Sequence, residues 1–149
     1  MELKEKLLQA CKNIVEQRLQ NIEKTIKSHQ NSLNSETKSS AGDKHETGRA
    51  MLQLEMEKAG KQLQSIQEIQ ETLSKIDSNV SSKIVCFGSI IQTDSGNYFL
   101  SSSIGQIQLE KEVYFAISTA SPIGKLLLGK QIGESVKFNE KTIKIQFVN

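Results

Sequence analysis

The chain has 149 residues, of which 36% are hydrophobic and 24% charged, and its net charge is +2. This length fits one domain or two small ones. So small a net charge does not imply nucleic-acid binding through bulk electrostatics alone. No apolar run approaches the length of a membrane-spanning helix. We expect a soluble, intracellular protein that has no contact with membranes.

The two cysteines, Cys11 and Cys86, lie far apart and show no metal-ligand spacing. This arrangement predicts two buried thiols. Free thiols are typical of a reducing compartment, so we expect a cytoplasmic location.

Residues 2–33 show apolar positions that alternate at spacings of four and three, which predicts one helix with a coiled-coil seam. The seam positions are Leu3, Leu7, Cys11, Ile14, Val15, Leu19, Ile22, Ile26, His29 and Leu33. The register shifts by one residue between Ile14 and Val15. So narrow an apolar stripe needs one partner helix.

Residues 47–77 repeat the pattern and predict that partner helix. Its seam positions are Leu52, Met56, Ala59, Leu63, Ile66, Gln70, Leu73 and Ile76. Residues 34–41 between the helices are polar and without periodicity, which predicts a loop. We therefore expect an antiparallel coiled-coil hairpin over residues 1–78, with its tip at residues 34–48. Such a hairpin is roughly 45 Å long, and it buries its own seam, so we expect a monomer.

Residues 83–149, after a polar linker, predict a small α+β domain with mostly antiparallel strands. The expected strands are 83–92, 97–101, 106–109, 113–118, 135–138 and 142–148, with a hairpin turn at 93–96. Residues 121–129 predict a short helix. Ser121 can cap its start, Pro122 suits its first turn and Gly129 suits its stop.

Asp43 and Glu46 are the chemically suggestive pair, and two interpretations of them stay open. Asp-x-x-Glu is the pattern of a capping box at the start of a helix. Two carboxylates on one helical face can also supply part of the oxygen shell of Mg²⁺, with water or phosphate completing it. Lys44 and Arg49, beside the pair, are either surface charge or contacts for phosphates near such a metal. No arrangement typical of nucleophilic catalysis or of a phosphate-binding loop is present.

Several segments resemble one protein family. Residues 42–46 (Gly-Asp-Lys-His-Glu) resemble the coiled-coil tip of the Gre transcript-cleavage factors, GreA and GreB, of bacterial RNA polymerase. Three segments of the second half are similar to the same family and are more specific than the short tip pattern. They are 85–89 (Val-Cys-Phe-Gly-Ser), 117–130 (Ile-Ser-Thr-Ala-Ser-Pro-Ile-Gly-Lys-Leu-Leu-Leu-Gly-Lys) and 132–136 (Ile-Gly-Glu-Ser-Val).

The resemblance implies an FKBP-like C-terminal domain that docks beside the polymerase secondary channel, with Ser121 and Pro122 in the docking region. It implies that the coiled coil enters that channel and brings Asp43 and Glu46 to the active centre, where they act in trans. The pair would hold an Mg²⁺ ion that the polymerase completes, so that the polymerase hydrolyses backtracked RNA. Lys44 and Arg49 would then lie near the nascent RNA 3′ end, and DNA would be contacted only indirectly. The chain itself would be an accessory factor and not an enzyme.

Two alternatives stay open. Residues 47–50 (Thr-Gly-Arg-Ala) stand where the family commonly has Asn-Ala-Glu-Tyr, so the aromatic residue is missing. This departure fits a secondary-channel regulator without cleavage activity. The other alternative, an FKBP-like prolyl isomerase on a coiled coil, has little support because the second half contains few aromatic residues and no Trp.

Overall fold

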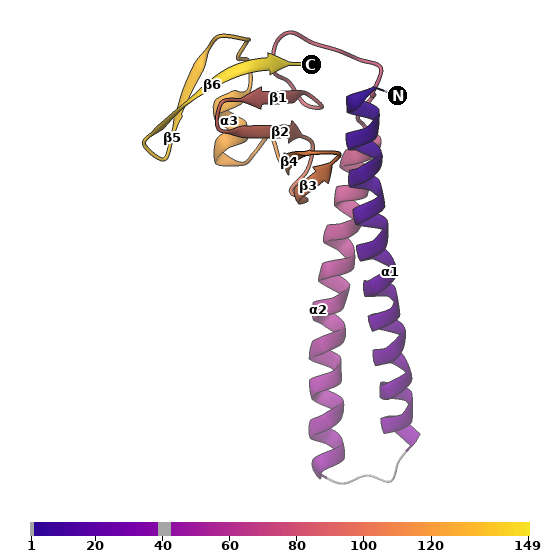
Figure 1. The fold of residues 1–149 in the computed structure, drawn as a ribbon. Helices are drawn as coiled ribbons and strands as arrows, with labels where there is room; N and C mark the ends of the chain where they lie inside the picture. Colours follow the sequence, from indigo (N-terminus) through magenta and orange to yellow (C-terminus); the bar gives the residue numbers. More distant parts are fainter. Residues whose placement is uncertain (1, 39–42) are drawn as a thin grey trace. The chain divides into compact units, whose positions relative to one another are not determined.

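The structure is a computed structural model that describes residues 2–38 and 43–149 (Figure 1). Side chains are not described for residues 36–38 and 43–46. Helix α1 (Leu3–Lys38) and helix α2 (Asp43–Ser74) form a hairpin, and a six-stranded sheet with the short helix α3 (Pro122–Leu127) follows. This confirms the predicted fold class, an N-terminal helical hairpin plus a C-terminal β domain with one short helix. Within the described residues, no helix is both long and apolar enough to cross a bilayer.

Two compact units make up the chain. One contains Met1–Ile14 together with Ile69–Asn149, and the other is Val15–Glu68. The first unit therefore includes the base of the hairpin as well as the sheet. The predicted domains, residues 1–78 and 83–149, divide the chain by secondary structure instead, and they stay a prediction.

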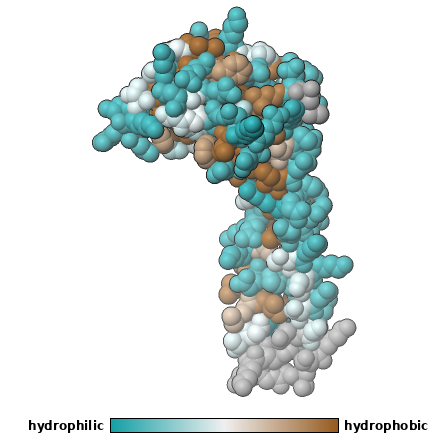
Figure 2. Space-filling model, in the orientation of Figure 1, coloured by the Kyte–Doolittle hydropathy of each residue, from teal (hydrophilic) through white to brown (hydrophobic). Residues whose placement is uncertain are grey.

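The unit Val15–Glu68 is held together by the predicted seam. Val15, Ile22 and Ala59 are buried, while His29 is half-buried. The other seam residues in this unit are half-buried too: Leu19, Ile26, Leu33, Leu52, Met56, Leu63 and Ile66. Figure 2 shows that the visible face of the helices is mainly hydrophilic, with small groups of hydrophobic residues along it. One narrow seam therefore provides the packing, as the spacing predicts.

Both helices extend further toward the connection than predicted. Helix α1 continues through residues 34–38, which the sequence predicts as loop, and α2 begins at Asp43 instead of residue 47. Starting a helix is costly, but each residue added to an existing helix forms one further hydrogen bond. Polar residues can therefore prolong a helix even where they form no apolar seam. The remaining loop prediction, residues 39–42, lies outside the described residues.

In the other unit, the base of the hairpin packs through residues of both helices. Leu7, Leu8 and Cys11 of α1 are buried, as are Leu73 and Ile76 near the end of α2. Leu8 does not belong to the predicted stripe. It is buried nevertheless, because this part of α1 has more than one neighbour to pack against. The Nζ atom of Lys6 also lies 3.0 Å from a carboxylate oxygen of Glu110 in the sheet domain.

The sheet has the strand order β3-β4-β2-β1-β6-β5. Its strands are β1 (Ile90–Thr93), β2 (Gly96–Leu100), β3 (Gly105–Leu109), β4 (Glu112–Ile117), β5 (Ser135–Phe138) and β6 (Lys141–Val148). Neighbouring strands are antiparallel except β2 and β4, which run parallel. The predicted hairpin between β1 and β2 is confirmed, since Thr93 pairs with Gly96 and its hydroxyl donates to the Gly96 carbonyl at 2.6 Å.

The predicted strand 83–92 is wrong over most of its length, because only Ile90–Thr93 is a strand. Before it, Val85 donates to the carbonyl of Lys130 and accepts from the amide of Gly129, outside the main ladder. Gly88 then has a φ of 90°, a left-handed conformation that strands do not use. Val85 therefore enters the core from a bent segment, whereas the neighbouring Ile84 is exposed.

Helix α3 follows its predicted capping closely. The Ser121 hydroxyl accepts from the amide of Gly124 at 3.1 Å and donates to the Ser118 carbonyl at 2.6 Å. Pro122 is the first helical residue, and Gly129, with a φ of 81°, follows the helix end. Ile123 and Leu127 point into the apolar core of the domain. The other members of that core are Val85, Ile91, Leu100, Val136, Ile143, Ile145 and Val148.

Replacing the capping hydroxyl should weaken this domain measurably. We expect Ser121→Ala to lower the free energy of unfolding by about 1 kcal/mol, because the Gly124 amide loses its acceptor. Urea unfolding followed by circular dichroism would measure the change. Ser135→Ala, at an exposed strand position, is the matched control and should change stability by less than about 0.5 kcal/mol. Equal effects of the two variants would contradict the capping role.

Candidate functional site

The first turn of α2 contains the predicted carboxylate pair. Asp43 is the first residue of the helix and Glu46 lies three residues later. Residues with this spacing are neighbours on one helical face, with Cβ atoms about 5–6 Å apart. The side chains of Asp43, Lys44 and Glu46 lie outside the described residues, so their predicted roles stay predictions.

The position of the pair, in the first turn of α2, leaves both interpretations open. Carboxylates in the first turn of a helix are stabilised by the helix dipole, whether or not they bind a metal. The exposed Arg49 lies three residues after Glu46 and so belongs to the same side of α2. A cation held by the acidic pair, and the guanidinium nearby, could each contact a phosphate group.

The two predicted docking residues differ in what they offer a partner. The Ser121 hydroxyl is engaged inside α3, as both donor and acceptor, and Ser121 is only half-buried. Pro122 is exposed at the start of the helix. Ser121 therefore stabilises the start of the helix through its internal hydrogen bonds, whereas the exposed Pro122 is accessible to a partner. These residues belong to one compact unit and the carboxylate pair to the other.

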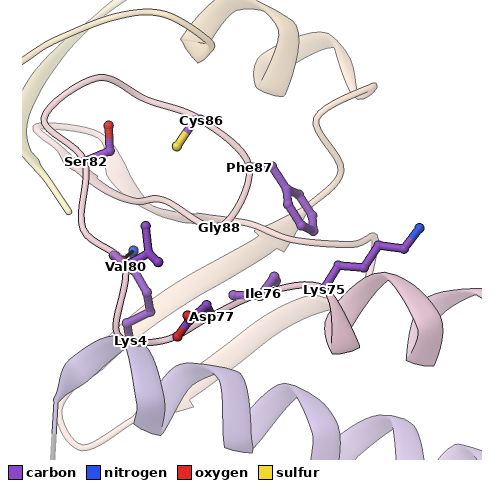
Figure 3. Close-up of a pocket in the computed structure, with 9 residues that line it drawn as sticks. All are labelled: Lys4, Lys75, Ile76, Asp77, Val80, Ser82, Cys86, Phe87 and Gly88. Carbon is purple, nitrogen blue, oxygen red and sulfur yellow. Dashed lines mark hydrogen bonds between the residues drawn. The ribbon is translucent and has the colours of Figure 1, made fainter.

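A cavity of about 150 Å³ lies at the base of the hairpin, within the unit that contains the sheet (Figure 3). Residues from the start of α1, from the segment that follows α2 and from the bend before β1 surround it. They are Lys4, Lys75, Ile76, Asp77, Val80, Ser82, Cys86, Phe87 and Gly88. This cavity was not predicted from the sequence.

Lys4 is the unusual residue of this cavity, because it is only 5% exposed. Its Nζ atom donates a hydrogen bond to the Val80 carbonyl at 2.8 Å, and Figure 3 shows the side chain extending toward Val80. Burial lowers the pKa of Lys4, and the nearby Cys86 and Asp77 partly oppose that shift. A sequence signal existed, since Lys4 precedes the buried Leu7 and Leu8 by three and four residues and so shares their helical face. The residue ties the linker to α1, which is a structural role.

The two cysteines differ, and the prediction of two buried thiols is wrong for one of them. Cys11 is buried, and burial raises the pKa of its thiol to about 12, although a hydrogen bond with Ser101 opposes the shift. Cys86 is exposed because it lies in the bent segment before β1 instead of in a strand. Its amide donates to the Ser89 hydroxyl at 3.0 Å, which stabilises the bend.

This difference predicts selective thiol chemistry. At pH 8, Ellman's reagent should modify about one thiol per native chain, because Cys11 reacts only when the protein opens. Both thiols should react in denaturing urea. A Cys86→Ser variant should lose the fast phase, and a Cys11→Ser variant should keep it. Two fast thiols in the native protein would contradict the burial of Cys11.

The fold and the candidate site together define a class of protein, a long helical hairpin with an acidic pair at the start of its second helix, joined to a small sheet domain. No family model matches the sequence, and no curated protein matches it. A solved structure described as GreA factor homolog 1 (Gfh1) of Thermus thermophilus is similar, with 16% identity and a TM-score of 0.35. The similarity covers 91% of this chain and 92% of that chain. A second structure, described as the transcription factor Gfh1, has 19% identity, a TM-score of 0.38 and 93% coverage of both chains.

Proposed function

We propose that this chain is an accessory factor of bacterial RNA polymerase that stimulates cleavage of backtracked RNA. The observation that carries the proposal is the helical backbone at residues 43–46, which sets Asp43 and Glu46 one turn apart at the start of α2. The family resemblance of residues 42–46 and 117–130 implies RNA polymerase as the partner of this pair and cleavage of backtracked RNA as the reaction. The chain contributes carboxylates, and the polymerase contributes the catalytic centre.

The length of the helices supports delivery to a recessed centre. Helix α1 has 36 residues, so it is about 54 Å long at 1.5 Å per residue. Helix α2 has 32 residues and begins next to the end of α1 in the chain. A hairpin of two long helices can enter a channel too narrow for a globular domain, and one narrow seam is sufficient to hold it together.

The donor set at the start of α2 suits Mg²⁺. This ion binds carboxylate oxygens, keeps several waters and often takes only one or two protein carboxylates. Asp43 and Glu46 would hold it weakly, and groups of the polymerase and the RNA would complete its shell. When bound, the ion supplies positive charge and a coordinated water for phosphodiester hydrolysis. Lys44 and Arg49 would contact phosphates near the RNA 3′ end.

The proposed setting is the bacterial cytoplasm, where the polymerase works. The chain would act as a monomer, with Ser121 and Pro122 in its docking region. The exposed Pro122 supports a surface contact there, and the Ser121 hydroxyl would keep its internal hydrogen bonds.

A second candidate function is a secondary-channel regulator without cleavage activity. The observation that favours it is the exposed Thr47, Arg49 and Ala50, a stretch in which no aromatic side chain is present to pack against an RNA end. The pair Asp43 and Glu46 would still perturb the active centre in this case.

Transcription assays with purified bacterial RNA polymerase separate the two candidates. A cleavage factor shortens the RNA of stalled complexes from its 3′ end and lets them resume. A regulator changes initiation or pausing while the RNA of stalled complexes keeps its length. The first result is expected, and the second would replace the proposed function with the alternative.

A further inference from the structure

The cavity at the base of the hairpin combines apolar walls with one buried cation (Figure 3). Three apolar side chains line it: Ile76, Val80 and Phe87. The cation is Lys4, which is buried although lysine side chains are usually exposed. Sites for small molecules are built in this way, with mainly apolar walls and a few polar groups that orient the ligand. The cavity has a volume of about 150 Å³, which is enough for a molecule about the size of benzene.

The ammonium group of Lys4 is only partly paired. An ammonium has three N–H donors. Among the described residues one acceptor, the Val80 carbonyl, receives a hydrogen bond from it, at 2.8 Å, and no carboxylate forms an ion pair with it. Buried charges in proteins are normally both hydrogen-bonded and paired with an opposite charge. Two donors of Lys4 are therefore available to a further acceptor within the cavity.

The neighbouring charges do not offset the loss of water around Lys4. Burial lowers the pKa of Lys4, and this effect outweighs the opposing effects of Cys86 and Asp77. One carboxylate oxygen of Asp77 already accepts a hydrogen bond from the Asn79 amide at 2.9 Å. Asp77 is also exposed, so solvent screens its charge. An anion inside the cavity would compensate the ammonium charge more directly.

Charge and size restrict the kind of anion. Lys4 and Lys75 contribute two positive charges to the lining and Asp77 one negative charge, so a single negative charge balances the cavity. Figure 3 shows the side chain of Lys75 pointing away from Lys4, so Lys4 is the group that a ligand inside the cavity meets. A carboxylate with a short hydrocarbon chain supplies one charge and an apolar surface. Inorganic phosphate carries up to two charges and has no apolar surface.

We propose that this cavity binds a small monocarboxylate of the size of propionate or butyrate. Its oxygens accept hydrogen bonds from the Lys4 ammonium, and its hydrocarbon chain lies against the three apolar side chains. The acidic pair of α2 takes no part in this site, so the site is independent of the proposed function.

Melting of the full chain tests binding. With about 20 mM propionate or butyrate and an affinity of about 1 mM, we expect Tm to rise by about 4 °C or more relative to sodium chloride at the same ionic strength. Lys4→Met should abolish the rise, because it removes the charge and keeps an unbranched side chain. The matched control is Lys12→Met, at an exposed position further along α1, which should retain the rise.

Protection of Cys86 tests the position of the ligand without any substitution. The Cys86 side chain lines the same cavity and is the exposed thiol of the chain, so a bound carboxylate should shield it. We expect about 20 mM butyrate to slow the fast modification by iodoacetamide, an uncharged reagent, about threefold or more. In the urea-unfolded protein butyrate should leave the rate unchanged.

Three results would overturn the proposal. The first is unchanged Tm and unchanged Cys86 reactivity with both carboxylates, which would mean that the cavity holds water alone. The second is an equal rise in Tm with sodium phosphate at the same ionic strength, which would indicate a general effect of anions. The third is a rise that Lys4→Met retains. If Lys4→Met does not fold, the protection of Cys86 in the wild-type chain decides.

Discussion

Gly124→Ala is expected to destabilise the sheet domain strongly. A Cβ atom at this position would lie 2.3 Å from the Ser118 carbonyl oxygen and 2.8 Å from the Ser121 hydroxyl. Both atoms belong to the cap of α3, so the backbone or the cap must shift to make room. We expect a loss of about 2–3 kcal/mol, and a fall in Tm of roughly 10 °C or more. Calorimetry would measure both.

The matched control is the same substitution at Gly60. A Cβ atom there meets nothing within 4 Å, and Gly60 is exposed in the interior of α2. Gly60→Ala should therefore stabilise the protein by about 0.5–1 kcal/mol through helix propensity. Opposite signs for the two variants would support the close approach at Gly124. A neutral Gly124→Ala would contradict it.

Neutralising the acidic pair is expected to remove the activity while leaving the fold intact. In Asp43→Asn/Glu46→Gln the side chains keep their size and lose the charges that would hold Mg²⁺. Losing several kcal/mol of transition-state stabilisation corresponds to a fall in the cleavage rate of about a hundredfold or more. Raising the Mg²⁺ concentration should restore part of the rate, because the metal site is weakened and not blocked.

The control for this variant is Glu55→Gln/Glu57→Gln. It removes two charges from exposed positions of the same helix, and it should retain the cleavage activity. Polymerase binding should be unchanged in both double variants, since docking is proposed to involve the sheet domain. Lost binding by Asp43→Asn/Glu46→Gln would contradict the role assigned to the pair. Equal losses of activity in both variants would show that the total charge of the helix matters and that the position of the pair does not.

Features that depend on neighbours in the chain were predicted well from the sequence. The seam at Val15, Ile22 and Ala59 follows from helical spacing, and the cap at Ser121 follows from local hydrogen bonding. The hairpin turn at Thr93 to Gly96 is local in the same sense. Each of these elements is decided by residues within one or two turns of the chain.

Features that depend on distant segments could not be predicted. The segment before Ile90 looks like a strand, but it bends, and the backbone partners of Val85 within it are Gly129 and Lys130, more than 40 positions away. The parallel pairing of β2 with β4 requires β3 to lie outside them in the sheet. The cavity at Lys4 exists only because the segments after α2 and before β1 lie beside the start of α1. The spacing of apolar and polar residues along the chain does not determine which distant segments come into contact.

RNA cleavage in a backtracked complex is the direct test of the role proposed for Asp43 and Glu46. A purified, backtracked elongation complex with labelled RNA would receive the wild-type chain, Asp43→Asn/Glu46→Gln or Glu55→Gln/Glu57→Gln, each with Mg²⁺. We expect rapid release of short 3′ fragments by the wild type and by the Glu55/Glu57 variant, and no release above background by the Asp43/Glu46 variant. RNA of unchanged length with the wild type bound to the complex would contradict that role.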